Sequence, residues 1–182
     1  MSTPAPGPDA VIAFWRDAGP EKWFARDGAF DIAFRDRFLD AHMAAAARRL
    51  DAWAATAEGA LALIILLDQF PRNAFRDTAH MFATDGLARH IAREALAAGH
   101  DRVVADELRV FFYLPFEHSE DMADQDLAVA LIHPLGKDVG TFAEIHRDII
   151  ARFGRFPHRN PALGRESTAD ERAFLAKGGF SG

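Results

Sequence analysis

Residues 57–76 read AEGALALIILLDQFPRNAFR, an apolar stretch that runs directly into a polar turn. Every residue from Ala60 to Leu67 is apolar, so a helix here has no polar face and must be surrounded by other elements. Thr56 predicts the start of this helix and Pro71 predicts its end after Phe70. Eight apolar residues are too few to span a bilayer, which needs about 20. The stretch therefore predicts a buried central helix, and we expect no membrane partner.

Further helical patterns lie on both sides of this stretch. Apolar residues recur at helical spacing along much of the chain, and no run of β-branched residues alternates with a period of two. We predict an all-α domain of seven or eight helices joined by short connections and packed as antiparallel pairs. No internal repeat of about 34 residues is visible. The predicted helices cover residues 10–18, 30–55 as one helix or two, 57–70, 85–98, 105–114, 121–132, 141–153 and 168–177, with a short turn near 78–83.

Length and composition limit the class of protein. The 182 residues are 49% hydrophobic, which is enough for one core, so we expect a single helical domain over residues 9–182 after a loose, proline-rich arm at residues 1–8. Cysteine is absent, which excludes disulfides, thiolate metal sites and cysteine nucleophiles. The net charge of −6 provides no basic field for nucleic acid, so no nucleic-acid partner is expected. Because no apolar leader is visible, we expect a cytoplasmic protein.

The basic residues comprise 18 Arg and 3 Lys. A GC-rich genome produces such a ratio, and so does selection of the planar guanidinium that binds carboxylate or phosphate through two parallel hydrogen bonds. Composition alone does not separate these explanations, so the positions of the arginines matter.

Three polar strings interrupt the helical pattern. The first, residues 67–76, ends the central helix; the second, residues 114–121, reads LPFEHSED; the third, residues 146–165, holds five Arg and two His against one acid. Polar side chains at helix ends often hydrogen-bond the terminal backbone N–H and C=O groups, which have no partner within the helix. Acidic residues are favourable at a helix start, so each string has a structural interpretation. The functional interpretation is that the strings converge. Its candidate ligand-binding residues are Asp68, Gln69, Arg72, Asn73, His146, Arg155, Arg159, Asn160 and Arg165.

Proton transfer needs different side chains from anion binding. His118 beside Glu120, together with His158, provides imidazoles with a carboxylate that can orient them, and we take these three as candidate catalytic residues. A metal site could be built from His118, Glu120, His146 and His158, but no metal-binding spacing is present and the arginines nearby disfavour a dication. We therefore expect no metal and no cofactor.

The polar strings resemble those of the domain-of-unknown-function 924 family (DUF924). The resemblance is carried by LLDQFPRN at residues 66–73, FATD at 82–85, PFEHSE at 115–120, RFGRFPHRN at 152–160 and LGREST at 163–168, and it extends from about Val11 to Leu175. It implies an all-helical fold of the tetratricopeptide-like superhelix type. It supplies no activity, substrate or catalytic residue.

Two hypotheses for function come from different classes. In the first, the strings form an Arg and His pocket that binds a small phosphate or carboxylate, with acid–base catalysis by histidine as an option. In the second, the protein is a tetratricopeptide-like scaffold for a protein or peptide partner, and the strings are internal braces. A weaker version makes the strings a buried ion network that serves fold specificity alone. The sequence does not decide whether the protein is an enzyme.

Overall fold

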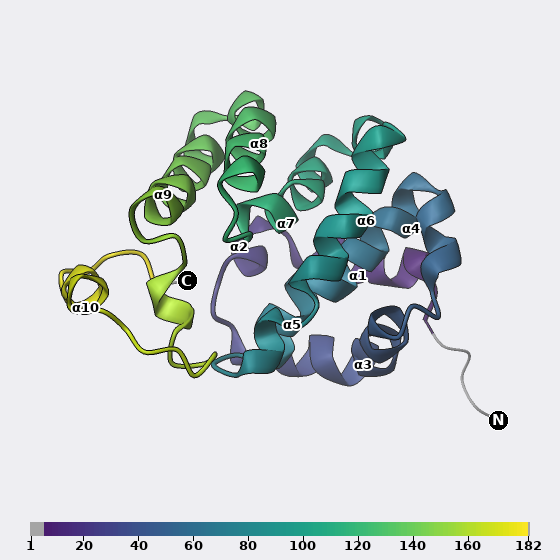
Figure 1. Ribbon diagram of the computed structural model, residues 1–182. Helices are drawn as coiled ribbons and strands as arrows, with labels where there is room; N and C mark the ends of the chain where they lie inside the picture. The colour runs from purple at the N-terminus through teal and green to yellow at the C-terminus, as the bar shows by residue number, and fades with distance from the viewer. Residues whose placement is uncertain (1–5, 182) are drawn as a thin grey trace. The chain divides into compact units, whose positions relative to one another are not determined.

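The computed structural model describes residues 6–181, and all regular secondary structure within that range is helical (Figure 1). The all-α prediction is confirmed. Seven of the α-helices have eight or more residues, in line with the seven or eight predicted. They are α1 (Pro8–Ala18), α3 (Gly28–Ala46), α4 (Ala57–Ile64), α6 (Asp85–Ala97), α8 (Met122–Ile132), α9 (Lys137–Phe153) and α10 (Ala169–Ala176).

The described residues form two compact units. Unit 1 comprises residues 6–76 and 80–115, and unit 2 comprises residues 77–79 and 116–181. The single domain over residues 9–182 and the tetratricopeptide-like superhelix stay predictions. The expected arm at residues 1–8 falls mainly on residues 1–5, outside the described range. Pro8 already belongs to α1, where it occupies the first turn and needs no hydrogen-bond partner for its nitrogen.

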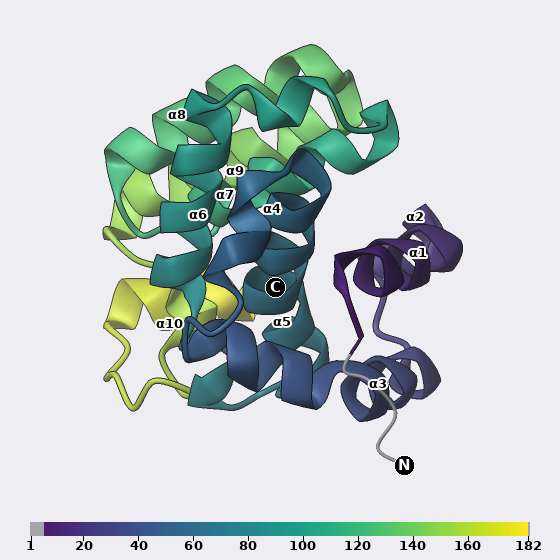
Figure 2. The ribbon, with the colours of Figure 1, turned by 90° about the vertical axis from the view of Figure 1, so that its right-hand side faces the viewer.

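The core of unit 1 is built from aromatic side chains of its first helices. Trp15 in α1 and Phe34 in α3 are fully buried, with ring centroids 5.4 Å apart. The Trp23 indole, at the end of α2 (Pro20–Trp23), donates a hydrogen bond to the carbonyl of Trp15. Figure 2 shows α1 and α2 beside the N-terminal half of α3. The burial of these large aromatic side chains holds the short N-terminal helices in place.

The central helix was predicted to end at Pro71, and this is wrong. After α4 the chain forms a π-helical turn, Ile65–Gln69, and then continues as α5 (Phe70–Ala74) with Pro71 in its first turn. Proline removes the N–H that would bond to the Leu67 carbonyl. Thr84 Oγ1 donates to that carbonyl instead, at 2.5 Å, and His42 Nδ1 donates to the Leu66 carbonyl at 2.8 Å. Side chains distant in sequence thus allow the helix to pass the proline.

Two other predicted helices also differ from the structure. The pattern over residues 30–55 breaks after Ala46, because Arg48 adopts a φ of 60° and its Nε bonds to Asp51; a 3₁₀ helix, Asp51–Ala55, follows. Residues 106–112 form a 3₁₀ helix rather than an α-helix, with Arg109 donating to the carbonyl of Asp101. The remaining short helices are the 3₁₀ helices Ala79–Phe82, His100–Arg102, His133–Leu135 and Pro157–Arg159, and α7 (Leu114–Glu117).

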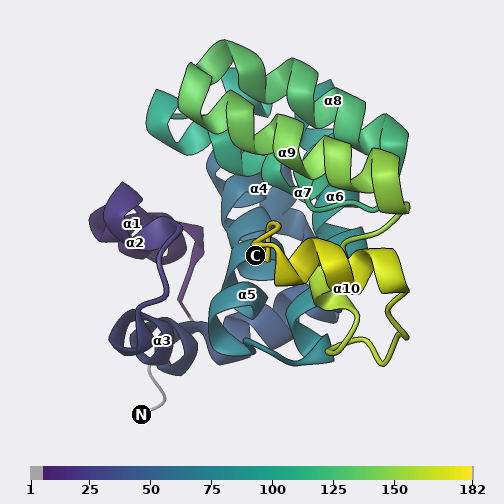
Figure 3. The same ribbon diagram turned by 90° about the vertical axis from the view of Figure 1, so that its left-hand side faces the viewer.

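Unit 2 is organised by the pair α8 and α9, which lie side by side in Figures 1 and 3. Asp121 caps α8 by accepting hydrogen bonds from the N–H groups of Ala123 and Asp124, and Gly154 ends α9 with a φ of 68°. The third string begins at His146 in α9 and continues past this glycine, so most of it is loop. The apolar core beside the loop consists of Ile149, Ile150 and Phe156, with Met122, Phe153, Phe174 and Phe180 packed against it.

In the part of the chain that the structure describes, none of the helices combines the length and hydropathy of a membrane span.

Candidate functional site

The first polar string lies in unit 1, where Arg72 is held by two carboxylates. Its guanidinium makes two hydrogen bonds to Asp85, of 2.8 and 3.0 Å, and lies 3.2 Å from Asp68. Asp68 is fully buried and also accepts a 2.6 Å bond from the Gln69 amide. The same guanidinium caps the Asp68 carbonyl at the end of the π-helical turn. Arg72 therefore ties the end of the central helix to the start of α6.

Asn73 and Arg76 continue this pattern toward α3. The Asn73 amide donates to Asp31 at 2.8 Å, and Arg76 binds the same carboxylate with bonds of 2.6 and 3.1 Å. Three of the polar side chains that end the central helix thus reach carboxylates on two other helices. This arrangement is what the brace interpretation of the first string predicts.

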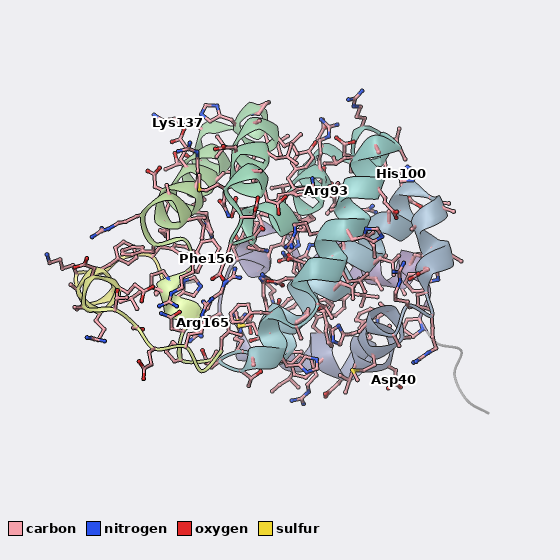
Figure 4. All side chains as sticks on the ribbon, viewed as in Figure 1. Asp40, Arg93, His100, Lys137, Phe156 and Arg165 are labelled. Atoms are coloured by element: carbon pink, nitrogen blue, oxygen red, sulfur yellow. The ribbon has the colours of Figure 1, made fainter. Side chains whose placement is uncertain are left out.

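The third string and residues 116–121 of the second string belong to unit 2, and an ion pair joins them there. Arg165 makes a two-bond pair with Glu120, with distances of 2.7 and 3.0 Å. Glu120 also accepts the backbone N–H of Phe156, and Arg165 donates to the Phe156 carbonyl; Figure 4 labels both residues on the loop after α9. Burial alone would raise the pKa of Glu120, but the bonds from Arg165 and Phe156 outweigh it and leave that pKa lowered.

A second pair fixes the other side of this loop. Arg155 binds Glu171 in α10 with bonds of 2.6 and 2.9 Å, and Asn160 donates to Glu171 at 3.2 Å. The hydrogen bonds from Arg155 lower the pKa of Glu171 to about 2, against the opposing effect of desolvation. Glu171 also completes a capping box with Thr168 at the start of α10. Arg155 and Arg165 are therefore both occupied by fixed carboxylates within unit 2.

Two residues of this loop, His158 and Arg159, lie near His146 of α9 and His118 of the α7–α8 connection; we call His118, His146, His158 and Arg159 the histidine cluster. The His146 ring lies 6.4 Å from the His118 ring and 4.4 Å from the Phe180 ring, measured between centroids. The His158 ring lies 5.6 Å from both Phe156 and Phe180. The Arg159 guanidinium carbon lies 4.4 Å from the Phe156 centroid. The Phe156 and Phe180 rings therefore each contact both His146 and His158.

The hydrogen bonds of His146 fix its tautomer. Its Nδ1 lies 2.8 Å from the carbonyl of Phe142, and a carbonyl only accepts, so Nδ1 carries the proton. Nε2 is then the nitrogen with the lone pair. Burial lowers the pKa of His146 to about 3, helped by the nearby His118, Arg159 and His158, although the bond to Phe142 opposes the shift. His146 is therefore a neutral hydrogen-bond acceptor at neutral pH and is unsuited to act as a general base there.

Two buried acids and one buried amide position the second string. Gln125 in α8 is fully buried, and its amide donates to the carbonyls of Glu117 and Ser119, on either side of His118. Glu117 places a carboxylate oxygen 3.4 Å from His146 Nδ1, and the Ser119 hydroxyl donates to Asp124. Sequence reasoning did not single out Gln125, Glu171 or Phe180. The sequence offered one clue to Gln125, which is an uncharged polar residue between Asp124 and Asp126 at an acidic helix start.

The cluster combines basic and acidic side chains. Arg159 supplies a fixed positive charge, and His118 and His158 can each gain one, while Glu117 and Glu120 are the nearby negative groups. Among residues 6–181, no set of three His, Asp or Glu side chains is arranged to hold a metal ion. Asn160 and Gln125 each bury an amide oxygen that receives no hydrogen bond from the described residues. These oxygens are acceptors that a water or a ligand donor would satisfy.

Known proteins place this fold firmly but assign it no activity. A solved structure titled "Structure of Protein of Unknown Function ATU0120 from Agrobacterium tumefaciens" is 58% identical, with a TM-score of 0.91 over 93% of this chain and 97% of that one. The comparison with curated proteins gives no match. The model of the family described as "Bacterial protein of unknown function (DUF924)" matches residues 11–179, so the chain belongs to this family.

Proposed function

We propose that unit 2 binds a small oxyanion, a phosphate or a carboxylate, at the histidine cluster, and that His118 and His158 exchange protons with it. The observation that carries the proposal is that His146 and His158 lie against the Phe156 and Phe180 rings, with His118 beside His146 and the Arg159 guanidinium on Phe156. Guanidinium and protonated imidazole are strong donors to oxyanions. His158 and Arg159 lie in a loop that ion pairs hold on both sides, and His146 lies on the preceding helix, α9, which supports a preorganised site.

Two of the candidate arginines are held by ion pairs within unit 2. Arg155 and Arg165 each make two bonds to one carboxylate, so a ligand would have to displace Glu171 or Glu120 to reach them. Arg159 is buried and stacks on Phe156. Its positive charge is near enough to His146 to help lower the pKa of that ring. We assign Arg159 to the ligand and the other two to the scaffold. Asp68, Gln69, Arg72 and Asn73 belong to unit 1 and are outside this proposal.

Neutral His146 gives the proposed site a preference that can be measured. Its Nε2 carries a lone pair that can accept a hydrogen bond. Inorganic phosphate keeps a proton near neutral pH, whereas sulfate keeps none. A buried hydrogen-bond acceptor favours a ligand that carries a hydrogen-bond donor over a similar ligand that carries none. The proposed site should therefore favour phosphate over sulfate, although the two ions have similar size and shape.

The experiment compares histidine NMR signals during titration with phosphate, sulfate and acetate at pH 6 and pH 8. We expect saturable shifts of His118, His146 and His158 with phosphate, about tenfold weaker binding of sulfate, and tighter binding at pH 6 because protonated imidazoles add positive charge. Arg159→Gln and His158→Asn should weaken binding at least about tenfold. The matched control is His133→Asn, since His133 is exposed and pairs with Glu144. Unchanged binding in Arg159→Gln would refute the proposal.

A second candidate is the scaffold function, favoured by the two-bond pairs of Arg72, Arg155 and Arg165 with internal carboxylates. In that case the histidine cluster is also a brace. Arg159→Gln and His158→Asn would then lower the melting temperature, and no oxyanion would shift the histidine signals of the wild-type protein. The same titration therefore separates the two candidates.

A further inference from the structure

A hollow of about 370 Å³ lies between α1, α2 and α3 in unit 1. It is independent of the histidine cluster, since none of its lining residues belongs to unit 2. The hollow is open to solvent, so a ligand there would be buried on one side only. The apolar lining residues are Phe14, Ala18, Ala29, Phe30 and Ala33. The charged lining residues are Asp17, Lys22 and Arg37. We call it the α1–α3 hollow.

The apolar part of the hollow has an aromatic wall and a helical wall. Phe14 and Phe30 stack with ring centroids 5.4 Å apart and planes inclined by 17°. Ala29 and Ala33 are exposed and lie one helical turn apart on α3, and their small side chains leave the space between the helices open. A flat apolar group of ligand size would exchange water for contacts with these rings and methyl groups.

The charged part of the hollow is positive on balance. Arg37 packs its guanidinium carbon 5.5 Å from the Phe14 centroid and 5.3 Å from the Phe38 centroid. Among residues 6–181, the guanidinium contacts these two rings and pairs with no carboxylate. Lys22 lies 5.9 Å from the Phe30 centroid and 3.4 Å from Asp27, and Asp17 is the one acid of the lining. Arg37 therefore holds donors available for an anionic group at the edge of an aromatic surface.

From these features we infer that the α1–α3 hollow binds a small aromatic carboxylate. The ring of the ligand packs against Phe14 and Phe30 beside Ala33, and its carboxylate takes two parallel hydrogen bonds from Arg37. The lining selects this class because a highly charged ligand such as a polyphosphate would lose its hydration against phenyl and methyl groups. An uncharged aromatic compound would leave the guanidinium without its partner.

The experiment titrates the protein with phenylacetate, phenylacetamide and acetate and follows backbone NMR signals of residues 14–37. We expect saturable binding of phenylacetate, about tenfold weaker binding of phenylacetamide, and no saturation with acetate. Arg37→Gln should bring phenylacetate to the level of the amide. Arg35→Gln is the matched control, because Arg35 is on the same helix, pairs with Asp36 and does not line the hollow.

A further variant fills the space itself. Ala33→Leu adds a side chain at an exposed helical position, so the fold should persist with an unchanged melting temperature while phenylacetate binding falls at least about tenfold. His158→Asn should leave phenylacetate binding intact, which keeps this inference separate from the proposed oxyanion site. Equal binding of the acid and the amide, equal effects of Arg35→Gln and Arg37→Gln, or full binding by Ala33→Leu would overturn the inference.

Discussion

The polar strings of the two units use arginine in the same way but differ in what lies beside it. In unit 1, Arg72 bonds to Asp85 and lies against Asp68, and the neighbouring residues are helix-capping groups. In unit 2, Arg155 and Arg165 make equivalent pairs, yet the loop they hold also carries His158 and Arg159 of the histidine cluster. A guanidinium at a helix break is thus a brace in both units. The imidazoles, rather than the arginines, distinguish the polar strings of unit 2 from the string of unit 1.

The largest effect should come from removing the brace of unit 1. Arg72→Met removes the guanidinium that pairs with two buried carboxylates, Asp68 and Asp85, and we expect a loss of about 3–5 kcal/mol of unfolding free energy. Urea unfolding measures this loss. The matched variant Arg35→Met removes an exposed pair, in which both side chains are about half exposed, and should cost at most about 0.5 kcal/mol. Similar losses for the two variants would show that Arg72 is not a structural brace.

The brace of unit 2 should be weaker, because water reaches it. The Arg165 and Glu120 side chains are 24% and 28% exposed, against 13% for Arg72 and 0% for Asp68. We expect Arg165→Met to cost about 1–3 kcal/mol, by the same urea measurement. The comparison of the units would fail if this variant proved more destabilising than Arg72→Met.

The sequence predicts these regions unequally, for physical reasons. An all-apolar helix has one stable environment, so residues 60–67 predict their own burial. The passage of the helix through Pro71 depends on Thr84 and His42, which lie far away in sequence. Asp85 and Glu171 resemble ordinary acids of a first helical turn, so nothing local marks them as the partners of Arg72 and Arg155. Phe180 follows the last helix with no pattern that places it on His146 and His158.

The histidine cluster should also give unit 2 a pH dependence of its own. The pKa of His146 in the folded protein is about 3, well below its ordinary value of 6.5. Between pH 3 and pH 6.5 this side chain is therefore protonated in the unfolded chain and neutral in the folded protein. Stability is therefore fully present above about pH 6.5 and falls as the pH is lowered, by up to about 1.4 kcal/mol per pH unit for this one group. Urea unfolding from pH 7 to pH 4.5 measures the slope.

His146→Gln tests that assignment, since it removes the titrating ring and should flatten the slope by the same amount. His133→Gln is its control, because His133 is 63% exposed. Acid should have a second effect at lower pH, where Glu171, with a folded pKa of about 2, loses its contribution as the pH falls from about 4.5 toward 2. A slope above pH 4.5 that persists in His146→Gln would assign it to another group.

The smallest effect should come from the cap that allows the central helix to pass Pro71. Thr84→Val keeps the shape of the side chain but removes the hydroxyl, leaving the Leu67 carbonyl buried without its donor, and we expect a loss of about 1–2 kcal/mol. Thr84→Ser keeps the hydroxyl and should recover most of the stability. If valine and serine behave alike, the methyl packing of Thr84 matters rather than its hydrogen bond, and the continuation of the helix must rest on His42 and the surrounding core. If valine alone is destabilised, a single hydroxyl from the start of α6 decides how the most apolar helix of unit 1 ends, and with it where Arg72 meets its two carboxylates.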